Sequence, residues 1–211
     1  MKEMHVIYEE PEFVVVVKSS GLLSVPGRGP ENLDCVSERV KTLYPGCIEQ
    51  PSVHRLDMDT SGLLVVARTK EVHRNISIQF QEREVNKRYI AILDGELDGE
   101  EGIVELPFRL DIDNRPHQIY DPVHGKVGIT HWKKLLVKDG KTRIEFKPIT
   151  GRTHQLRVHS ASEYGLGIPI VGDQFYGTGT GLESLQLHAC YLAFAHPRSG
   201  ESLEFNSEPL F

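Results

Sequence analysis

The segment HRLDMDTSG, residues 54–62, brings several reactive groups into one short stretch of the chain. Asp57 and Asp59 are two residues apart, so in an extended segment both carboxylates would point the same way. Two carboxylates on one side can serve glycosidic-bond chemistry as acid and nucleophile. Asp59 also has a structural interpretation, because an aspartate ahead of Thr, Ser and Gly can accept hydrogen bonds from turn amides.

Asp57 differs from Asp59 because it lies between two apolar residues. A carboxylate against apolar neighbours must find a partner or become neutral. Arg55 would lie on the opposite side of an extended strand, so it is a poor partner. The segment GRTHQLRVH offers Arg157, which helical geometry places inward, and such a pair would keep Asp57 ionised. An ordinary surface arginine is the alternative interpretation of Arg157.

Other kinds of site find less support in the sequence. The histidines include no pair at i,i+4 on an expected helix, the spacing typical of a zinc site. Ser61 lies in TSG and lacks the GxSxG elbow of serine hydrolases. The Gly- and Pro-rich residues 19–34 lack the GxxxxGK[ST] pattern that binds nucleotide phosphates.

The elements around this segment must position its side chains. The apolar run 63–67 predicts a buried strand directly after the TSG turn. Thr69 predicts the N-cap of a helix over residues 70–81, with apolar residues four apart on one face. Thr153 predicts a second cap, for a helix ending near Tyr164 with Gly165 as its left-handed stop.

The remaining pattern is rich in strands with short connections. Strands are expected at 6–8 and 13–17, a hairpin about Asp139-Gly140, and two final strands around residues 197–200. Another helix is expected at 35–43. The fold class predicted from these elements is α+β, with a large, mainly antiparallel (mixed) sheet flanked by helices.

Composition indicates a folded globular protein of 211 residues with 39% hydrophobic residues and a net charge of -6. No apolar run approaches the roughly 20 residues of a membrane helix. The first residues, MKEMHVIYEEPEF, carry acids where a signal peptide has its apolar core. Three widely spaced cysteines indicate free thiols. We therefore expect a cytoplasmic protein.

Charge is unevenly distributed along the chain. Residues 92–121 contain nine acids and two arginines, whereas residues 131–160 contain eight bases and two acids. A solvated face is the common explanation. A basic surface on an acidic protein can also bind a nucleic-acid backbone, and residues 131–160 are the candidate for such contacts.

Several segments, in this order, resemble the motifs of the RluA-type pseudouridine synthases. HRLDMDTSG and GRTHQLRVH form a highly specific combination, and the resemblance covers nearly the whole chain. The other matching segments are VVVVKSSGLLSVPGR (14–28), KRYIAILDG (87–95), RPHQIYDPVHGK (115–126), GDQFYG (172–177) and LHACYLAFAHPRSGE (187–201).

The resemblance implies roles for individual residues. Asp57 matches the family's catalytic aspartate, whereas Asp59 falls on a variable position. Tyr89 matches the tyrosine that stacks under the target base, and Arg157 matches the arginine that pairs with the aspartate. Arg55 matches the arginine that enters the space left by the flipped nucleotide.

The resemblance also implies the activity and the organisation of the chain. The reaction converts uridine in RNA to pseudouridine and needs no metal or other cofactor. Residues 1–211 would form a single pseudouridine synthase catalytic domain, with two sub-lobes that share one sheet and a cleft between them. The family pattern starts near residue 6, which leaves no room for an N-terminal S4-type domain. A monomer acting on a stem-loop of rRNA or tRNA is expected, without a membrane partner.

Two alternatives belong to other functional classes. A catalytically inactive RNA-binding relative would be expected to lack Asp57, Tyr89 or Arg157, and all three are present. A nucleoside- or glycoside-processing hydrolase would use Asp57 and Asp59 and would release free base or sugar.

Overall fold

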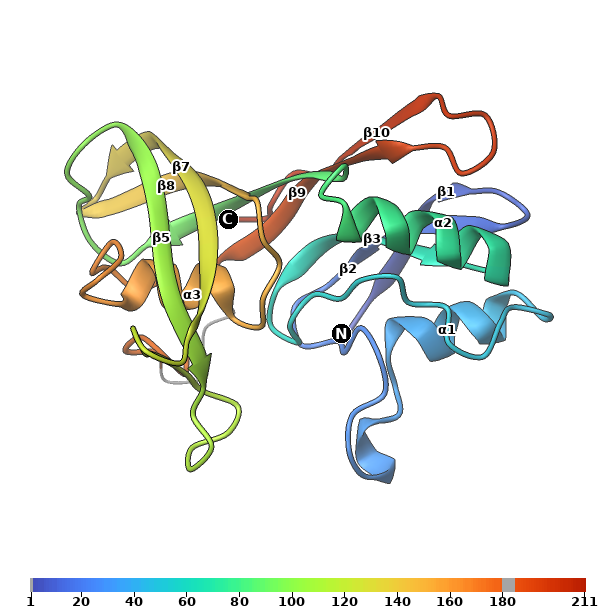
Figure 1. Cartoon of the computed structure of the whole chain (residues 1–211), viewed down its shortest axis with the longest axis horizontal. Coiled ribbons are helices and arrows are strands. Elements are labelled where there is room, and N and C mark those ends of the chain that lie inside the picture. Colours follow the sequence, from blue (N-terminus) through green and yellow to red (C-terminus); the bar gives the residue numbers. More distant parts are fainter. Residues whose placement is uncertain (1, 180–184) are drawn as a thin grey trace. The chain divides into compact units, whose positions relative to one another are not determined.

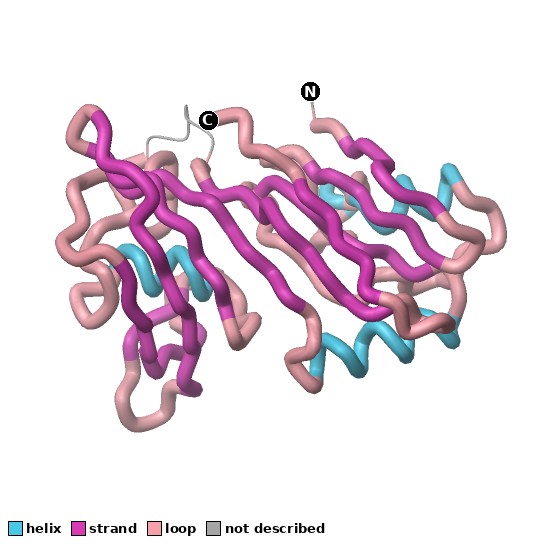
Figure 2. The backbone as a smooth tube through the Cα atoms, turned by 90° about the horizontal axis from the view of Figure 1, so that it is seen from above, coloured by secondary structure: helices cyan, strands magenta, loops and turns pink. Residues whose placement is uncertain are grey.

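The structure is a computed structural model that describes residues 2–179 and 185–211. The chain divides into two compact units, one of Met1–Lys87 with His188–Leu210 and one of Arg88–Leu187 with Phe211. Strands make up most of the regular structure in both units (Figures 1 and 2). Within the described residues, no helix is long and apolar enough to cross a membrane.

The strands are β1 (Met4–Glu9), β2 (Phe13–Lys18), β3 (Ser61–Ala67), β4 (Asn86–Leu93), β5 (Glu101–Leu110), β6 (Gln118–Tyr120), β7 (Lys126–Lys138), β8 (Lys141–Pro148), β9 (Leu187–Ala195) and β10 (Ser202–Asn206). The helices are the short 3-10 helix η1 (Pro30–Asn32), α1 (Val36–Leu43), α2 (Lys70–Gln81) and α3 (Gln155–Ala161).

In the first unit, β2 lies between β1 and β3 and is antiparallel to both. β9 pairs parallel with the start of β3 and antiparallel with β10. Gly62 permits the β3–β9 contact, because a Cβ at this position would lie 2.3 Å from the carbonyl oxygen of Ala189. The glycine of the TSG sequence is therefore required by the close approach of two strands.

In the second unit, every strand pair is antiparallel: β4 with β8, β8 with β7, β7 with β5, and β5 with β6. Asp139 and Gly140 connect β7 to β8 with φ values of 53° and 71°. Two positive φ angles in a two-residue connection are typical of a type I′ hairpin turn, as predicted. The predicted fold class, α+β with a large, mainly antiparallel sheet, is confirmed.

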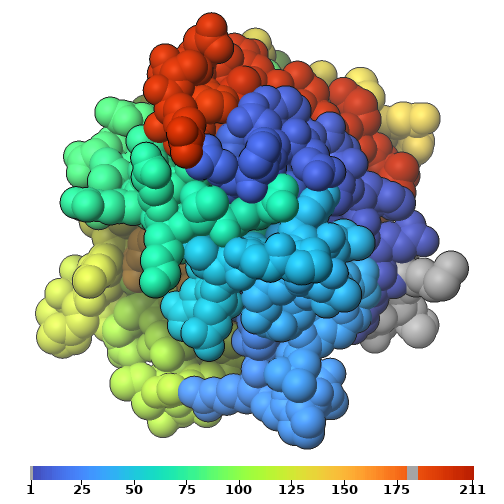
Figure 3. Space-filling model, turned by 90° about the vertical axis from the view of Figure 1, so that its right-hand side faces the viewer, coloured from blue at the N-terminus to red at the C-terminus, as the bar shows by residue number. Residues whose placement is uncertain are grey.

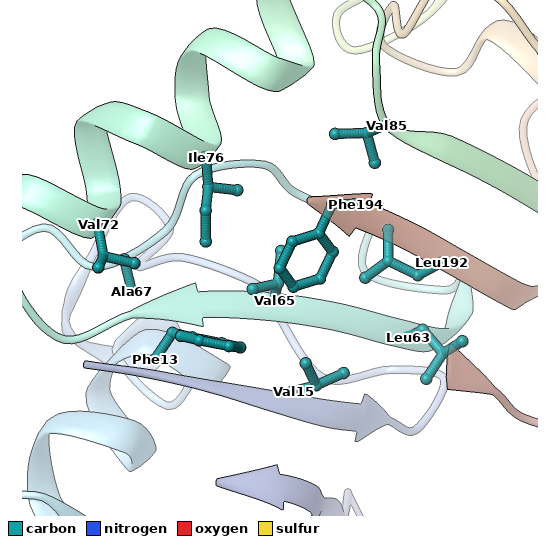
Figure 4. Packing of buried hydrophobic residues seen from close by; sticks show 10 residues of the cluster. All are labelled: Phe13, Val15, Leu63, Val65, Ala67, Val72, Ile76, Val85, Leu192 and Phe194. Carbon is teal, nitrogen blue, oxygen red and sulfur yellow. The ribbon is translucent and has the colours of Figure 1, made fainter. Parts of the chain in front are cut away.

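The core of the first unit forms where α2 packs against β2 and β3 (Figure 4). Val72 and Ile76 project from α2 toward Phe13 and Val65, and all four are almost completely buried. The side chain of Thr69 accepts a hydrogen bond from the amide of Val72, so the predicted cap is confirmed. This core holds β3, and with it the segment that precedes β3.

The segment predicted as a Gly- and Pro-rich loop, residues 19–34, contains only η1 as regular structure. Its outer part, coloured blue in Figure 3, projects from the surface of the first unit. Its inner part returns to the fold, where the hydroxyl of Ser24 donates to the carbonyl of Leu56 and accepts from the amide of Leu56.

The prediction for α3 was wrong at both ends. The helix starts at Gln155 rather than after Thr153, because the Gln155 side chain accepts from the Thr150 hydroxyl and the Arg152 amide and holds the preceding residues in a turn. The helix ends at Ala161, and Gly165 is not in the left-handed region. A Cβ at Gly165 would meet the carbonyl of His159 at 2.2 Å, so close packing explains this glycine.

His159 on α3 is a buried histidine without hydrogen-bond partners among the residues that the structure describes. Its ring meets Phe108 edge-on at 5.7 Å. Burial, together with the nearby charge of Arg152, lowers the pKa of His159 to about 4. The ring is therefore neutral at physiological pH.

We predict that His159 makes folding sensitive to acid. The unfolded chain, with a histidine pKa near 6.5, binds the proton before the folded protein does. The free energy of unfolding should therefore fall by about 3 kcal/mol between about pH 6.5 and pH 4. Denaturant titrations should show that His159→Leu loses less stability over this range. The exposed His131→Leu is the matched control, and an identical pH dependence in wild type and His159→Leu would contradict the prediction.

Candidate active site

The segment HRLDMDTSG forms a tight turn at the entrance to β3. The amide of Thr60 donates to the carbonyl of Asp57 at 3.2 Å, so residues 57–60 form a turn. The expectation of an extended segment with parallel carboxylates was therefore wrong. The Ser20 hydroxyl donates to the carbonyl of Asp59 at 2.7 Å, and the Gly21 amide donates to that of Met58 at 2.9 Å. Contacts to backbone carbonyls hold the turn.

Lys18 supports this turn from inside the first unit. Its side chain is fully buried at the end of β2, and its Nζ donates to the carbonyls of Leu22 at 2.7 Å and Met58 at 2.8 Å, and to that of Ser19. Burial lowers the pKa of Lys18 to about 7, and the carboxylates of Asp59 and Asp57 oppose this shift. The sequence analysis missed this lysine, whose signal is a charged residue closing an apolar strand.

His54 holds the other end of the turn segment. Its Nε2 accepts a hydrogen bond from the amide of Val65 at 3.1 Å, and its ring stacks on Phe80 of α2 at 4.4 Å. Burial, with the nearby charge of Lys87, lowers the pKa of His54 to about 3. A neutral ring with Nε2 as acceptor gives His54 a structural role, because its hydrogen bond joins the segment to β3. Arg55, the next residue, is exposed.

Arg157 of the second unit is buried, as its inward orientation predicted. Its Nε donates to Oδ2 of Asp173 at 2.8 Å, and its Nη2 donates to Oδ1 at 2.6 Å. Asp173 is completely buried and also accepts from the amides of Phe175 and Tyr176. Asp173 was not predicted as a site residue, although it lies in the matching segment GDQFYG. Asp57 lies in the first unit, and its pairing with Arg157 stays a prediction.

Aromatic rings surround this buried ion pair. The Arg157 guanidinium carbon lies 4.9 Å from the ring centre of Phe175 and 5.5 Å from that of Tyr176. His154, with φ 57°, stacks on Phe175 and contacts the Tyr176 hydroxyl through Nδ1 at 2.7 Å. The amide of Gln118 donates to the same hydroxyl. The segments GRTHQLRVH and GDQFYG therefore form one packed group that fixes Arg157.

Tyr89 lies on β4 in the second unit, opposite Phe146 of β8 in the register. Its ring is half-buried and packs against the core around Phe146 together with Trp132. The structure thus places Tyr89 and Arg157 in the second unit, and Arg55 and Asp57 in the first.

The basic stretch 131–160, expected to contribute to RNA backbone contacts, is partly engaged inside the protein. Five of its eight bases make contacts inside the second unit, with acids or with carbonyl oxygens. The pairs are Lys134 with Glu100, Lys141 with Asp94, Arg143 with the Phe211 carbonyl, Arg152 with the Phe108 carbonyl, and Arg157 with Asp173. Two of these pairs, Lys134 with Glu100 and Lys141 with Asp94, join the acidic and basic windows. The role of residues 131–160 as an RNA backbone surface stays a prediction.

We predict that Asp173→Asn lowers the free energy of unfolding by about 3 kcal/mol, because Arg157 would keep a buried charge without its counter-ion. Chemical denaturation measures the change. Asp34→Asn is the matched control, because Asp34 also binds an arginine through two oxygens but is exposed. An exposed pair contributes little, so equal losses in the two variants would contradict the account.

We also predict that Lys18→Met lowers the free energy of unfolding by about 2–4 kcal/mol, because three carbonyls in one buried and two part-buried hydrogen bonds lose their donor. The free energy of unfolding should be measured near pH 6, below the pKa of about 7 at which Lys18 loses its charge. Lys41→Met, which removes a surface pair with Glu38, is the control and should change stability little. Unchanged stability of Lys18→Met would show that the lysine does not hold the turn.

The chain shows clear similarity to known proteins. Residues 12–162 match the family model described as RNA pseudouridylate synthase. The dual-specificity RNA pseudouridine synthase RluA of Yersinia pestis is 45% identical over 212 residues, which cover 99% of this chain and 100% of that protein. The enzyme of the same name from Escherichia coli (strain K12) is 43% identical over 206 residues, covering 96% of this chain and 91% of that protein.

A solved structure supports the same assignment. Human RNA pseudouridylate synthase domain containing 1 matches with a TM-score of 0.76 and 28% identity, covering 98% of this chain and 84% of that chain. The family match spans more than half of the sequence, and the relatives are similar over nearly their full length. The chain therefore belongs to the RluA-type family of RNA pseudouridine synthases, isomerases that convert uridine in RNA to pseudouridine.

Proposed function

We propose that this synthase acts on uridines in stem-loops of rRNA or tRNA, with Asp57 as the reacting group. The observation that carries the proposal is the position of Asp57 in a turn that Lys18, Ser20 and Gly21 hold through its backbone. The name of the relatives, dual-specificity synthases, supports a substrate range of more than one RNA. A stem-loop suits a protein that reads RNA by shape and by splayed bases.

The reaction rearranges bonds without any change in composition. The C1′–N1 bond breaks, the uracil rotates, and a C1′–C5 bond forms. C5 loses its proton and N1 gains one, so no oxidant, reductant or further reactant is needed. The Asp57 carboxylate can attack C1′ as a nucleophile, or it can remove a sugar proton as a base and give a glycal. Both routes need an ionised carboxylate held in a fixed position.

Tyr89 and Arg55 would assist by accommodating a flipped nucleotide. Extruding a base from the stack costs a few kcal/mol. Stacking on an aromatic ring such as that of Tyr89 offsets about 1–3 kcal/mol of this cost. Arg55 is exposed next to the turn, which supports a contact of its guanidinium with RNA. In this proposal Arg55 enters the space that the flipped nucleotide leaves.

Arg157 would act as the cationic partner of Asp57. The pair with Asp173 uses Nε and Nη2 of Arg157 and fixes the plane of the guanidinium. A guanidinium with a fixed plane suits the recognition of a second carboxylate. In this proposal Asp173 is a positioning residue, and Arg157 is the group that keeps Asp57 ionised.

The proposal also includes the two sub-lobes of a single catalytic domain, with the reacting groups in a cleft, and a monomer that works in the cytoplasm. The free cysteines Cys35, Cys47 and Cys190 support a reducing compartment.

We predict that Asp57→Asn lowers the rate of pseudouridine formation at least about a thousandfold, as expected for loss of the reacting carboxylate. RNA labelled with tritium at uracil C5 reports the reaction by tritium release, and RNA binding should persist. Asp59→Asn is the matched control and should keep most activity, because its position holds the turn through the backbone. Activity in Asp57→Asn would refute the assignment, and release of free uracil by the wild type would indicate a hydrolase.

A further inference from the structure

β5 has one open edge in the second unit. It pairs with β7 from Glu101 to Phe108, but on its other side it pairs with β6 only from Phe108 to Leu110. Figure 1 shows β5 beside β7 along this length. Within residues 2–179 and 185–211, no strand covers β5 before Phe108 on that side. An uncovered edge offers backbone donors and acceptors to another extended chain.

The hydrogen bonds of β5 show which backbone groups reach the open edge. The Pro107 carbonyl accepts from the Asp121 amide on the β6 side, whereas the Glu100 carbonyl accepts from Lys134 on the β7 side. Backbone groups in an antiparallel strand alternate between its two sides. The amides and carbonyls of Ile103 and Glu105 therefore point toward the open edge.

A groove of about 520 Å³ runs along this edge, between β5 and the residues after α3. Its apolar lining includes Val104, Trp132, Tyr164 and Leu166. The indole of Trp132 covers Gly102, where a Cβ would lie 3.0 Å from the ring. Tyr164 is 58% exposed, so this wall presents an aromatic surface to solvent.

The opposite face of the β5 edge is acidic. Glu101 and Glu105 are exposed and alternate with the residues that face the groove. Lys133 lies opposite Glu101 in the register, whereas Ile129 lies opposite Glu105. A strand added to this edge would place alternate side chains over the groove and beside these glutamates.

We propose that the β5 edge is a docking site for an extended protein segment in which basic and apolar residues alternate. The apolar residues would fill the groove over Trp132, and the basic residues would pair with Glu101 and Glu105. The backbone would bond to Ile103 and Glu105 by strand addition. The glutamates disfavour a nucleic acid, whose phosphates they repel, and they disfavour a second copy of the same acidic edge.

Trp132 is the single tryptophan of the chain, so its fluorescence reports occupancy of the groove. The probe is a short, end-capped peptide in which lysine and valine alternate, titrated into the full chain. The expected result is a saturable change with one site. Two control peptides should each bind at least about tenfold more weakly than the lysine–valine peptide. One is a glutamate–valine peptide, and the other is a lysine–valine peptide N-methylated at the pairing amides.

Ile103→Pro removes an edge donor, and Ile103→Thr keeps it and serves as the matched control. The proline variant should bind the lysine–valine peptide about tenfold more weakly than the threonine variant. Unchanged pseudouridine formation in the proline and threonine variants shows that both variants fold. The N-methylated peptide tests strand addition in the wild-type protein, whether or not the variants fold. The proposal would be overturned if the lysine–valine peptide caused no fluorescence change, or if the methylated peptide bound equally well. Occupancy of the groove by oligouridylate instead, or self-association of the protein through this edge, would also overturn it.

Discussion

The candidate site depends on how the turn that carries Asp57 is held at the entrance to the buried strand β3. Lys18 is fully buried, and its ammonium binds the carbonyl of Met58, one residue beyond Asp57. The Gly21 amide and the Ser20 hydroxyl also donate hydrogen bonds to carbonyls of the same turn. These contacts go to carbonyl oxygens of the turn and not to its side chains. A reacting group needs this kind of support, since misplacement by a fraction of an ångström reduces the rate strongly.

The two units stabilise buried charge by different means. In the first unit, three carbonyls solvate the Lys18 ammonium and burial still lowers its pKa to about 7. In the second unit, a bidentate bond to Asp173 neutralises Arg157, and the aromatic rings of Phe175 and Tyr176 flank the guanidinium. An arginine with a fixed plane suits recognition of a carboxylate better than a lysine does. Each motif of the family therefore contributes a support as well as a candidate reacting or binding group.

Local signals in the sequence predicted much of the fold but less of the site. The Thr69 cap and the Asp139-Gly140 turn were correct, because caps and hairpin turns depend on adjacent residues. β5 was missed, although the alternation of buried Val104, Leu106 and Phe108 with more exposed residues is the period-two pattern of a strand. Asp173 and Lys18 were missed because their partners lie far along the chain, and no local period reports such contacts. The resemblance to a family, rather than periodicity, gave Asp57 and Tyr89 their specific roles.

Hydrogen exchange at the turn tests the central claim most directly. The claim is that backbone contacts hold the turn and that the Asp57 carboxylate is needed for the proposed chemistry rather than for the shape of the turn. The informative amides are those of Gly21, Thr60 and Val65, which bond within or beside the turn. The account predicts that Asp57→Asn leaves their protection unchanged while pseudouridine formation is lost. If Asp57→Asn lost both the protection of these amides and its activity, the carboxylate would be shown to hold the turn. This result would contradict the account.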